Sequence, residues 1–508
     1  MMLRSQIRNE IEKIVPRGAV FSVGKPDNPE HGDYSSNVAL VLAKELKKNP
    51  REVAEELTPR LRLGRLSRIC EKVEVAGPGF LNFWIKKEAL VDALLSRMFP
   101  RVVPQKINLE FVSANPTGPL TMANGRGGFY GDALANVLEA AGHKVTREYY
   151  INDAGNQIKL LGESILAAEG KIPQKDEYYK GGYIKELKGK SAEAATKILL
   201  GEIKKSLKKA GIKFNVWFSE ADMRKKNGLK KVLEFLNKKK LIKEKEGALW
   251  LGDAVVVKSS KEPTYFLADL AYHYDKFIKR KFDFAINIWG ADHHGYVERM
   301  KKGVEALGVN SERLKMIIMQ LVRLTSGGKE ARMSKRAGEF ITLDDLLKEV
   351  GVNSARWFFL ERSPDTHMDF DLDLARERSK KNPVYYVQYA HVRCHSILKK
   401  AQISKSKLRA SSKTQISKLD KPEELNLIKK ILQLPEIIED VTSDYQVHRL
   451  PRYAYELAQT FTNFYEKYHV IDSKNPELTQ TRLFLVSVAQ KTVKTTLSLM
   501  GIAAPEKM

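Results

Sequence analysis

The chain has 508 residues, with 87 lysine and arginine against 62 aspartate and glutamate residues, a formal net charge of +25. Hydrophobic residues make up 43% and charged residues 29%, a globular profile that excludes wholesale disorder and, at this length, predicts about three domains. No apolar run approaches the roughly 18 residues that a membrane span needs, and residues 1–8 lack the apolar core of a secretory signal. Because the only cysteines are Cys70 and Cys394, a disulfide framework is excluded and a reducing, cytoplasmic location without membrane contact is expected.

The positive charge favours a polyanionic partner such as a nucleic acid, with simple solubility as the alternative. Lysines are spread along the chain, for example at 204–205, 238–240 and 380–381, and do not gather in one tail. This spread indicates a large folded basic surface rather than a disordered arm.

The first domain, residues 1–95, is predicted to be a small α+β unit. Helical spacing runs through residues 37–43 and 53–57. A Gly-Pro-Gly turn at 77–79 leads into an aromatic-rich strand at 80–85.

Residues 100–350 are predicted to form an α/β domain. Strand patterns at residues 107–112 and 145–151 flank a helix that ends at Gly142, and a second strand–helix–strand unit covers 285–289, 296–307 and 316–319. Two such units predict a Rossmann-like parallel sheet. The lysine-rich, helical stretch at about 160–250 is interpreted as an insertion that splits it.

Residues 351–508 are predicted to be an all-α domain without strands. Apolar residues recur at helical spacing over 384–399, 423–440 and 476–500. The Ser/Lys-rich residues 404–418 are expected to form an exposed loop.

The loop after the first strand of the α/β domain, residues 113–128, is a candidate phosphate site. It joins the carboxyl end of a strand to the N-terminus of a helix, where ligands of open α/β sheets bind. Glycines at 125, 127, 128 and 131 allow a close approach to its backbone. A dinucleotide fingerprint is disfavoured, because residues 113–124 separate the strand from the first glycine and the glycine spacing misses G-x-G-x-x-G.

A second candidate is the basic loop at residues 326–338, in which glycines flank Lys329, Arg332, Ser334, Lys335 and Arg336. Such a loop can close over a polyphosphate and neutralise charge that develops during phosphoryl or nucleotidyl transfer. A solvated basic turn is the alternative.

Two histidine groups raise the question of a metal. His293 and His294 follow the strand at 285–289, but adjacent side chains in an extended segment point apart, so Asp292 with one histidine facing a cleft is favoured. His391 and His395 share a helix face without the glutamate of a zinc protease. No metal site is predicted.

Tyr265 and Asp269 form a carboxylate–aromatic pair on one side of a helical turn. Buried aspartates are uncommon unless paired, so Asp269 could receive a cationic group of a substrate, with a surface N-cap as the alternative.

Taken together, these segments resemble the arginyl-tRNA synthetases among class I aminoacyl-tRNA synthetases. The resemblance covers essentially the whole chain in order and is carried by residues 110–120 (EFVSANPTGPL), 147–157 (REYYINDAGNQ), 290–295 (GADHHG), 385–391 (YYVQYAH) and 500–508 (MGIAAPEKM). The family's His-x-Gly-His signature is replaced here by Thr121-Met122-Ala123-Asn124. Its Lys-Met-Ser-Lys-Ser loop is replaced by residues 332–336 (RMSKR).

The resemblance implies a two-step reaction: L-arginine attacks the ATP α-phosphate to give arginyl-adenylate, and the arginyl group passes to the terminal adenosine 2′-OH of tRNA(Arg). It implies ATP with Mg²⁺, a cytoplasmic monomer, an N-terminal domain that reads the tRNA D-loop and C-terminal helices that read the anticodon. No enzyme nucleophile is needed, because positioning and charge neutralisation carry such a reaction.

Site residues are implied for each ligand by the same resemblance. The residues implied in catalysis are Lys335, Arg332, Ser334, Thr121 and Asn124. Those implied in binding ATP are Gly118, Pro119, Thr121, Asn124, Gly125, Gly127, Gly290, Asp292, His293, Met333 and Lys335. Those implied in binding arginine are Glu110, Ser113, Asn115, Tyr265, Asp269 and His293. Those implied in binding tRNA are Phe80, Asn82, Tyr386, Tyr389, Arg393 and Tyr465.

Two further hypotheses stay open. Since Thr121 and Asn124 stand where the family has histidines, the chain could be a weakened relative that binds tRNA or amino acid without charging it. It could also be a different class I synthetase or a nucleotidyltransferase.

Overall fold

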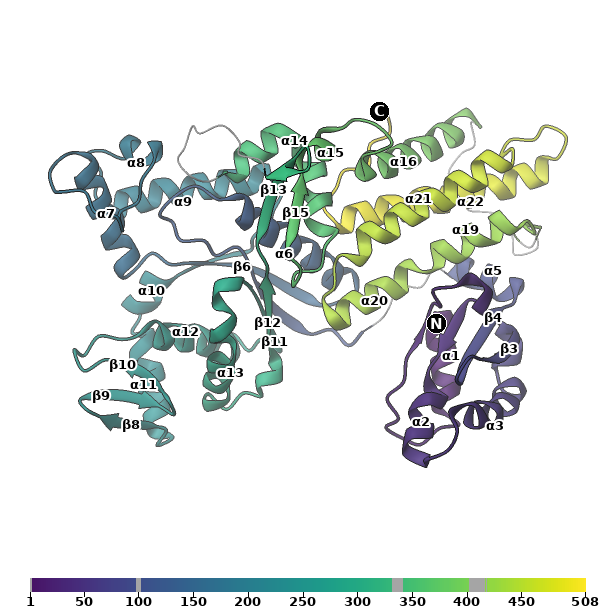
Figure 1. Ribbon diagram of the computed structural model, residues 1–508, viewed down its shortest axis with the longest axis horizontal. Coiled ribbons are helices and arrows are strands. Elements are labelled where there is room, and N and C mark those ends of the chain that lie inside the picture. Colours follow the sequence, from purple (N-terminus) through teal and green to yellow (C-terminus); the bar gives the residue numbers. More distant parts are fainter. Residues whose placement is uncertain (1, 97–101, 331–340, 402–415, 417) are drawn as a thin grey trace.

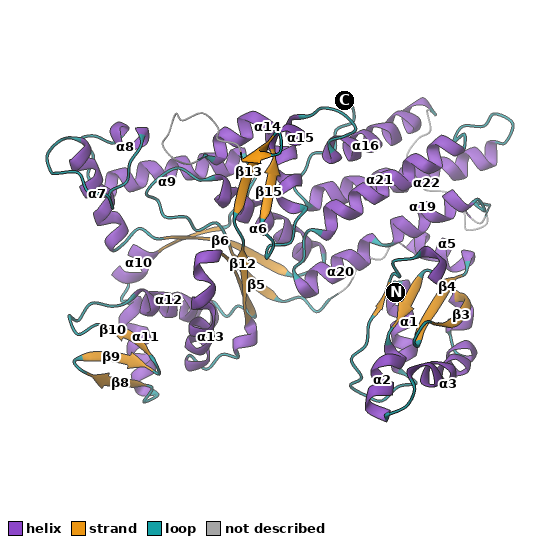
Figure 2. Ribbon diagram, viewed as in Figure 1, coloured by secondary structure: helices purple, strands orange, loops and turns teal. Residues whose placement is uncertain are grey.

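The computed structural model describes residues 2–96, 102–330, 341–401, 416 and 418–508. The chain forms an N-terminal α+β domain, a central parallel sheet with its helices, and a C-terminal helical domain (Figures 1 and 2). This architecture confirms the predicted fold class. Among the described residues, no helix is both long and apolar enough to cross a bilayer.

The N-terminal domain packs helices against an antiparallel sheet of strand order β1-β2-β4-β3. The predicted strand at 80–85 is confirmed as β4. Its strands are β1 (Val23–Gly24), β2 (Tyr34–Ser36), β3 (Cys70–Ala76) and β4 (Phe80–Ile85), and its helices are α1 (Leu3–Glu12), α2 (Val38–Leu46), α3 (Pro50–Leu63), α4 (Leu66–Ile69) and α5 (Lys87–Ser96).

The central sheet has five parallel strands in the order β12-β11-β5-β6-β7. Both predicted strand–helix–strand units are present, so the parallel Rossmann-like sheet is confirmed. The strands are β5 (Lys106–Glu110), β6 (Lys144–Ile151), β7 (Val216–Ser219), β11 (Phe284–Gly290) and β12 (Leu314–Met319), and the crossover helices are α6 (Met122–Ala140) and α13 (Val297–Ala306). Helix α6 ends as predicted, with Gly142 at a φ of 107°.

The stretch predicted as a helical insertion also contains strands. Strand β7 returns to the edge of the central sheet beside β6, and a separate antiparallel sheet has the order β10-β9-β8. The prediction of helix alone was therefore wrong, because four-residue strands between long helices give little periodic signal. The elements are α7 (Asn156–Ala168), α8 (Gly182–Glu186), α9 (Ala192–Lys209), α10 (Glu220–Lys225), α11 (Gly228–Lys238), β8 (Ile242–Lys245), β9 (Ala248–Leu251) and β10 (Ala254–Val257).

A small sheet of order β14-β13-β15 connects the central and C-terminal parts. It is formed by β13 (Val322–Ser326), β14 (Lys329–Glu330) and β15 (Met368–Asp371). The expectation that strands stop near residue 350 was therefore wrong. Helix α14 (Leu343–Leu360) runs past the expected domain boundary and breaks there, at Gly351, whose φ of 76° and ψ of 163° are not helical.

The C-terminal domain is built from long helices. Residues predicted as one helix over 423–440 form two, because Pro435 stands in the first turn of the second helix and cannot donate a backbone hydrogen bond to the first. The helices are α15 (Leu372–Arg376), α16 (Pro383–Lys400), α19 (Pro422–Leu432), α20 (Leu434–Asp444), α21 (Arg449–Lys467) and α22 (Pro476–Leu499). The loop predicted at 404–418 lies outside the described residues except for Ile416 and Lys418.

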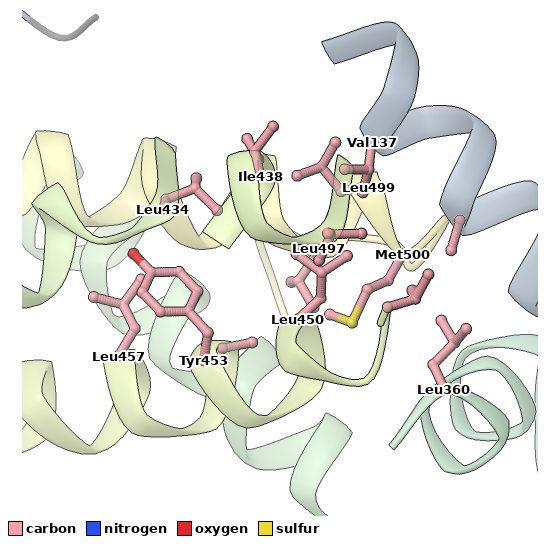
Figure 3. Close-up of a cluster of buried hydrophobic side chains, with 14 of the residues drawn as sticks. Val137, Leu360, Leu434, Ile438, Leu450, Tyr453, Leu457, Leu497, Leu499 and Met500 are labelled. Atoms are coloured by element: carbon pink, nitrogen blue, oxygen red, sulfur yellow. The ribbon is translucent and has the colours of Figure 1, made fainter. Parts of the chain in front are cut away.

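Apolar side chains join the central and C-terminal parts in one core (Figure 3). Val137 of α6 and Leu360 of α14 face Leu499 and Met500 there. Beside this core, the Arg356 guanidinium is 1% exposed and donates to Asp132 Oδ2 at 2.9 Å, Gly211 O at 2.8 Å and Met500 O at 3.0 Å. Arg356 thus joins α6, the end of α9 and the residue after α22.

The N-terminal domain contacts the helical domain, as Figure 1 shows for α5 beside α19. Tyr34 donates to Glu436 Oε1 at 2.7 Å, and Arg4 pairs with Asp440 at 2.8 Å. These contacts tie β2 and α1 to α20.

Candidate active site

The candidate site lies where the two halves of the central sheet meet. Strands β5 and β11 are neighbours in parallel register, with Glu110 opposite Asn287. The loops at their carboxyl ends, residues 111–121 and 291–296, therefore leave the same edge of the sheet. The strand order reverses there, and open α/β sheets bind ligands at such a point.

The loop after β5 begins with strained backbone. Val112 has a φ of 67° and Ser113 a φ of 39°, values that L-residues, and a β-branched valine above all, rarely adopt. Two bonds hold the strained turn: the Tyr150 amide donates to Ser113 Oγ at 3.1 Å, and Tyr149 OH donates to Ala114 O at 2.7 Å. Beyond it, the side-chain amides of Asn115 and Asn152 meet at 3.1 Å. The turn fixes Ser113 and Asn115, two of the residues predicted to bind arginine.

Thr121 and Asn124 form a capping box at the start of α6. The Thr121 amide donates to Asn124 Oδ1 at 2.9 Å, and the Asn124 amide donates to Thr121 Oγ1 at 3.3 Å. The box starts the helix and directs its positive dipole end into the loop. Both residues are half-buried.

Packing within the protein requires Gly131 most strictly among the glycines of α6. A Cβ on Gly125 would lie 2.7 Å from Leu343 Cδ1, and one on Gly128 would lie 2.7 Å from Ile212 Cδ1. A Cβ on Gly131 would overlap the Phe111 ring. Packing therefore accounts for Gly131, whereas a Cβ on Gly127 would meet no atom closer than Ile288 Cγ2 at 4.0 Å. The binding of ATP by Gly125 and Gly127 stays a prediction.

Asp269 of α12 (Tyr265–Tyr274) is half-buried, and Tyr296 OH donates to its Oδ2 at 2.7 Å. Burial raises the pKa of Asp269 to about 7; the Tyr296 hydrogen bond and Lys276 oppose the rise, and the charges of Glu110 and Glu220 add to it. Tyr296 belongs to the turn η3 (Ala291–Tyr296), next to the predicted 290–295 motif. The sequence analysis missed Tyr296.

The other carboxylates near Asp269 are paired with cations. Lys276 Nζ lies 2.7 Å from Glu110 Oε2, Arg280 Nη2 lies 2.9 Å from Glu148 Oε1, and Arg224 Nη2 lies 2.6 Å from Glu220 Oε1. Among the described residues, Asp269 has no such ion pair. A carboxylate without a cation in a partly buried site suits a cationic ligand. Glu110, predicted to bind arginine, already has a cation.

Other residues that were predicted to bind arginine or ATP are more exposed than Asp269. Tyr265 is 58% exposed, one turn before Asp269. Asp292 and His293 lie on the exposed turn η3, with His293 Nε2 3.4 Å from Asp292 Oδ2 and its ring 5.3 Å from that of Trp289. Within the described ranges, no three histidine, cysteine or carboxylate side chains are grouped so that they could hold a metal ion.

Most of the predicted basic loop lies outside the described residues. Arg332, Met333, Ser334, Lys335 and Arg336 lie outside the described residues. The chain resumes at Ile341, whose carbonyl accepts from the Met122 amide at 3.0 Å, while the Leu343 amide donates to Leu120 O at 2.8 Å. Ile341 and Leu343, which follow the loop in the sequence, are therefore hydrogen-bonded to the start of α6.

Three of the residues predicted to contact tRNA lie together on α16 and α21. The Arg393 guanidinium carbon is 5.3 Å from the ring centroids of both Tyr389 and Tyr465. Tyr386 instead packs on Tyr455 at 5.2 Å.

In the N-terminal domain, Phe80 is 37% exposed, whereas Asn82 is 2% exposed inside the sheet. The placement of Asn82 near an unstacked base of the tRNA stays a prediction.

The split parallel sheet, the loop after β5 and the helical C-terminal domain define a class I aminoacyl-tRNA synthetase. Residues 170–373 match the family of the tRNA synthetases class I (R), catalytic domain, residues 1–85 match the arginyl tRNA synthetase N terminal domain, and residues 387–508 match the DALR anticodon binding domain. The chain belongs to the arginyl-tRNA synthetase family.

Relatives match over nearly the whole chain. An arginine–tRNA ligase of Carboxydothermus hydrogenoformans is 42% identical over 96% of this chain and 94% of its own length. A putative arginyl-tRNA synthetase from Campylobacter jejuni is 34% identical and superposes with a TM-score of 0.75, covering 84% of this chain and 100% of that structure. The Thermus thermophilus arginyl-tRNA synthetase, at 23% identity, shares the fold with a TM-score of 0.80 over 100% of both chains.

If Asp269 binds the arginine guanidinium, its raised pKa predicts a pH dependence for arginine binding. Because the raised pKa of about 7 leaves the carboxyl neutral at lower pH, the KM for arginine should rise about tenfold between pH 8 and pH 6. Steady-state kinetics across this range would measure the rise, with the KM for ATP as the reference. An Asp269→Asn variant should lose this pH dependence, and a wild-type KM for arginine that stays flat over the same range would contradict the assignment.

Proposed function

We propose that the chain joins L-arginine to tRNA(Arg) in two steps, through arginyl-adenylate and transfer to the terminal adenosine 2′-OH. The observation that carries this proposal is Asp269, which has no ion pair among the described residues, whereas its neighbours Glu110 and Glu220 are each paired with a cation. Arginine's guanidinium is always protonated and offers its donors in a planar fork, so it can neutralise the Asp269 carboxylate and donate hydrogen bonds to its two oxygens. Tyr296 keeps Asp269 in place.

The amino-acid end of the substrate is assigned to the loop after β5. Ser113 and Asn115 follow the strained turn there, at the edge of the sheet where the loops of β5 and β11 meet. Binding the guanidinium at Asp269 and the other end at this loop would direct the arginine carboxylate toward the start of α6. This placement prepares an in-line attack on the α-phosphate without a nucleophile from the enzyme.

ATP is assigned to the N-terminal end of α6 and the loops beside it. Gly118 and Pro119 precede the helix, and the dipole at the Thr121–Asn124 box favours a phosphate. Gly290, Asp292 and His293 would approach the nucleotide from the end of β11. We assign the neutralisation of developing phosphate charge to Lys335 and Arg332, with Met333 and Ser334 in the same loop, and we place Mg²⁺ on the ATP phosphates.

The tRNA is assigned to surfaces of the two outer domains. The half-exposed cluster of Tyr389, Arg393 and Tyr465 offers rings and a guanidinium on which an anticodon base can stack. Phe80 is the candidate contact of the N-terminal domain. We propose that the enzyme acts as a monomer in the cytoplasm.

ATP–pyrophosphate exchange tests the proposal. With tRNA present, exchange should depend on arginine and on none of the other amino acids, and aminoacylation should follow. Exchange with a different amino acid would contradict the choice of substrate. RNA binding without any exchange would indicate a relative that does not activate amino acids.

Asn124→Ala tests the assignment of the capping box. We expect the KM for ATP to rise about tenfold or more, because a hydrogen bond to a charged phosphate contributes about 1.5–3 kcal/mol. Ser191→Ala is the control for the loss of a helix cap: Ser191 is the N-cap of α9 and accepts from the Ala194 amide at 3.2 Å. Equal KM values for ATP in the two variants would remove Asn124 from the ATP site.

A further inference from the structure

Lys276 is an enclosed cation that the proposed reaction does not use. Its side chain is 0% exposed, in a π-helical turn (Asp275–Lys279) that directly follows α12. Nζ donates to Glu110 Oε2 at 2.7 Å and to Asn287 Oδ1 at 3.0 Å, and it lies 4.0 Å from the Tyr272 ring centroid. A buried lysine is rare, and π-helical turns are frequent at functional sites.

The charge of Lys276 fixes the orientation of two further side chains. Because an ammonium group only donates, Asn287 must present its oxygen to Lys276 and its Nδ2 to His273 Nε2, 3.0 Å away. His273 Nε2 is therefore the acceptor, and the imidazole proton lies on Nδ1, which donates to Asp269 O at 2.8 Å. Burial lowers the pKa of His273 to about 3, so the ring stays neutral and keeps this one tautomer.

These bonds connect the three elements that surround the arginine pocket. Glu110 ends β5, and Asn287 lies beside it on β11 in the parallel register. Asp269 lies on α12, seven residues before Lys276 in the same helical segment. One ammonium group thus attaches the helix of Asp269 to both central strands.

We propose that Lys276 is a positioning residue of the arginine pocket. It binds Glu110 directly, and through Asn287 and His273 it is connected to the backbone carbonyl of Asp269 on α12. This inference rests on the proposed function, because it assigns Asp269 to the arginine guanidinium. Lys276 is enclosed and acts only through its neighbours. It also cancels the charge of Glu110, which leaves Asp269 as the carboxylate that a single guanidinium can satisfy.

The test compares full-length variants by ATP–pyrophosphate exchange with tRNA present, at a temperature at which melting curves show each variant to be folded. Lys276→Met is expected to raise the KM for arginine at least about tenfold while the KM for ATP changes by less than about twofold. Lys276→Arg, which keeps the charge and the donors, is expected to recover a large part of this loss. Lys279→Met is the matched control, because Lys279 lies in the same π-helical turn, is 42% exposed and pairs only with Asp275 among the described residues.

Asn287→Leu keeps the test decisive if Lys276→Met does not fold. This variant leaves the Lys276–Glu110 pair in place, removes the link to His273, and is expected to raise the KM for arginine about threefold or more without a change for ATP. The proposal is overturned if the folded variants keep the KM for arginine within about twofold of the wild type, or if the two KM values rise by the same factor. Wild-type protein that shows no exchange with arginine would overturn the proposed function itself, whatever the variants do.

Discussion

Replacing Asp269 by asparagine is expected to raise the KM for arginine by roughly 30- to 4,000-fold. Truncating one partner of a desolvated, hydrogen-bonded charge pair costs about 2–5 kcal/mol, and each 1.4 kcal/mol is tenfold in affinity. Asparagine has the same shape and can still accept from Tyr296, so the loss would report the missing charge. The measurement is the KM for arginine in pyrophosphate exchange, together with the affinity for tRNA, which should stay nearly unchanged.

Asp253→Asn provides the matched control. The Asp253 side chain is 79% exposed, and its pair with Lys302 at 3.4 Å lies at the surface. Such pairs contribute little, so the control should leave the KM for arginine unchanged. If Asp269→Asn behaves like Asp253→Asn, the guanidinium binds elsewhere.

Replacing Arg356 by methionine is expected to lower the free energy of unfolding by about 3–5 kcal/mol. The variant would leave the buried Asp132 carboxylate with only the more distant Arg147 guanidinium, whose Nε lies 4.0 Å from Oδ1, and the carbonyls of Ala210, Gly211 and Met500 without their bonds from Arg356. These groups belong to α6, to the end of α9 and to the C-terminal helices. The loss of their bonds to Arg356 should therefore also weaken the contact between the central and C-terminal domains. Urea unfolding would measure the loss, and limited proteolysis would show which part separates first.

Arg323→Met is the control for the arginine-to-methionine change itself. Arg323 pairs with Asp369 at 2.9 Å, but its side chain is 66% exposed, so the expected loss is below about 1 kcal/mol. A second variant, Arg356→Met with Asp132→Leu, removes both charges and should recover part of the stability. Equal urea midpoints for Arg356→Met and Arg323→Met would show that the buried Arg356–Asp132 pair does not hold the central and C-terminal domains together.

The sheet and its crossover helices could be predicted because each has a long segment with a clear hydrophobic period. The alternation over 107–112 and 145–151 and the helix that ends at Gly142 are local signals, and the structure confirms them. Strand β15 shows a buried–exposed alternation as well, but its four residues are too short to stand out between helices. Pro435 does mark the break between α19 and α20, although the continuous apolar spacing on both sides hides it.

The charges of the candidate site were harder to predict from the sequence, because its carboxylates pair with cations that are far away in the sequence. Nothing near Glu110 in the sequence indicates that Lys276, on another element, takes up its charge. Glu220 follows β7, a strand that the sequence analysis missed, so its place beside the cleft could not be predicted. The sequence therefore indicated which residue types form the candidate site. The three-dimensional arrangement decides which carboxylate has no cation of the protein beside it and can bind a cationic ligand.

The close packing of Gly131 on Phe111 has an evolutionary consequence. Phe111 is the residue before the strained Val112–Ser113 turn, so a methyl group at position 131 would push directly on the segment that carries Ser113 and Asn115. A lineage can accept alanine at 131 only together with a smaller residue at 111. In an alignment of relatives, these two positions should therefore covary in volume.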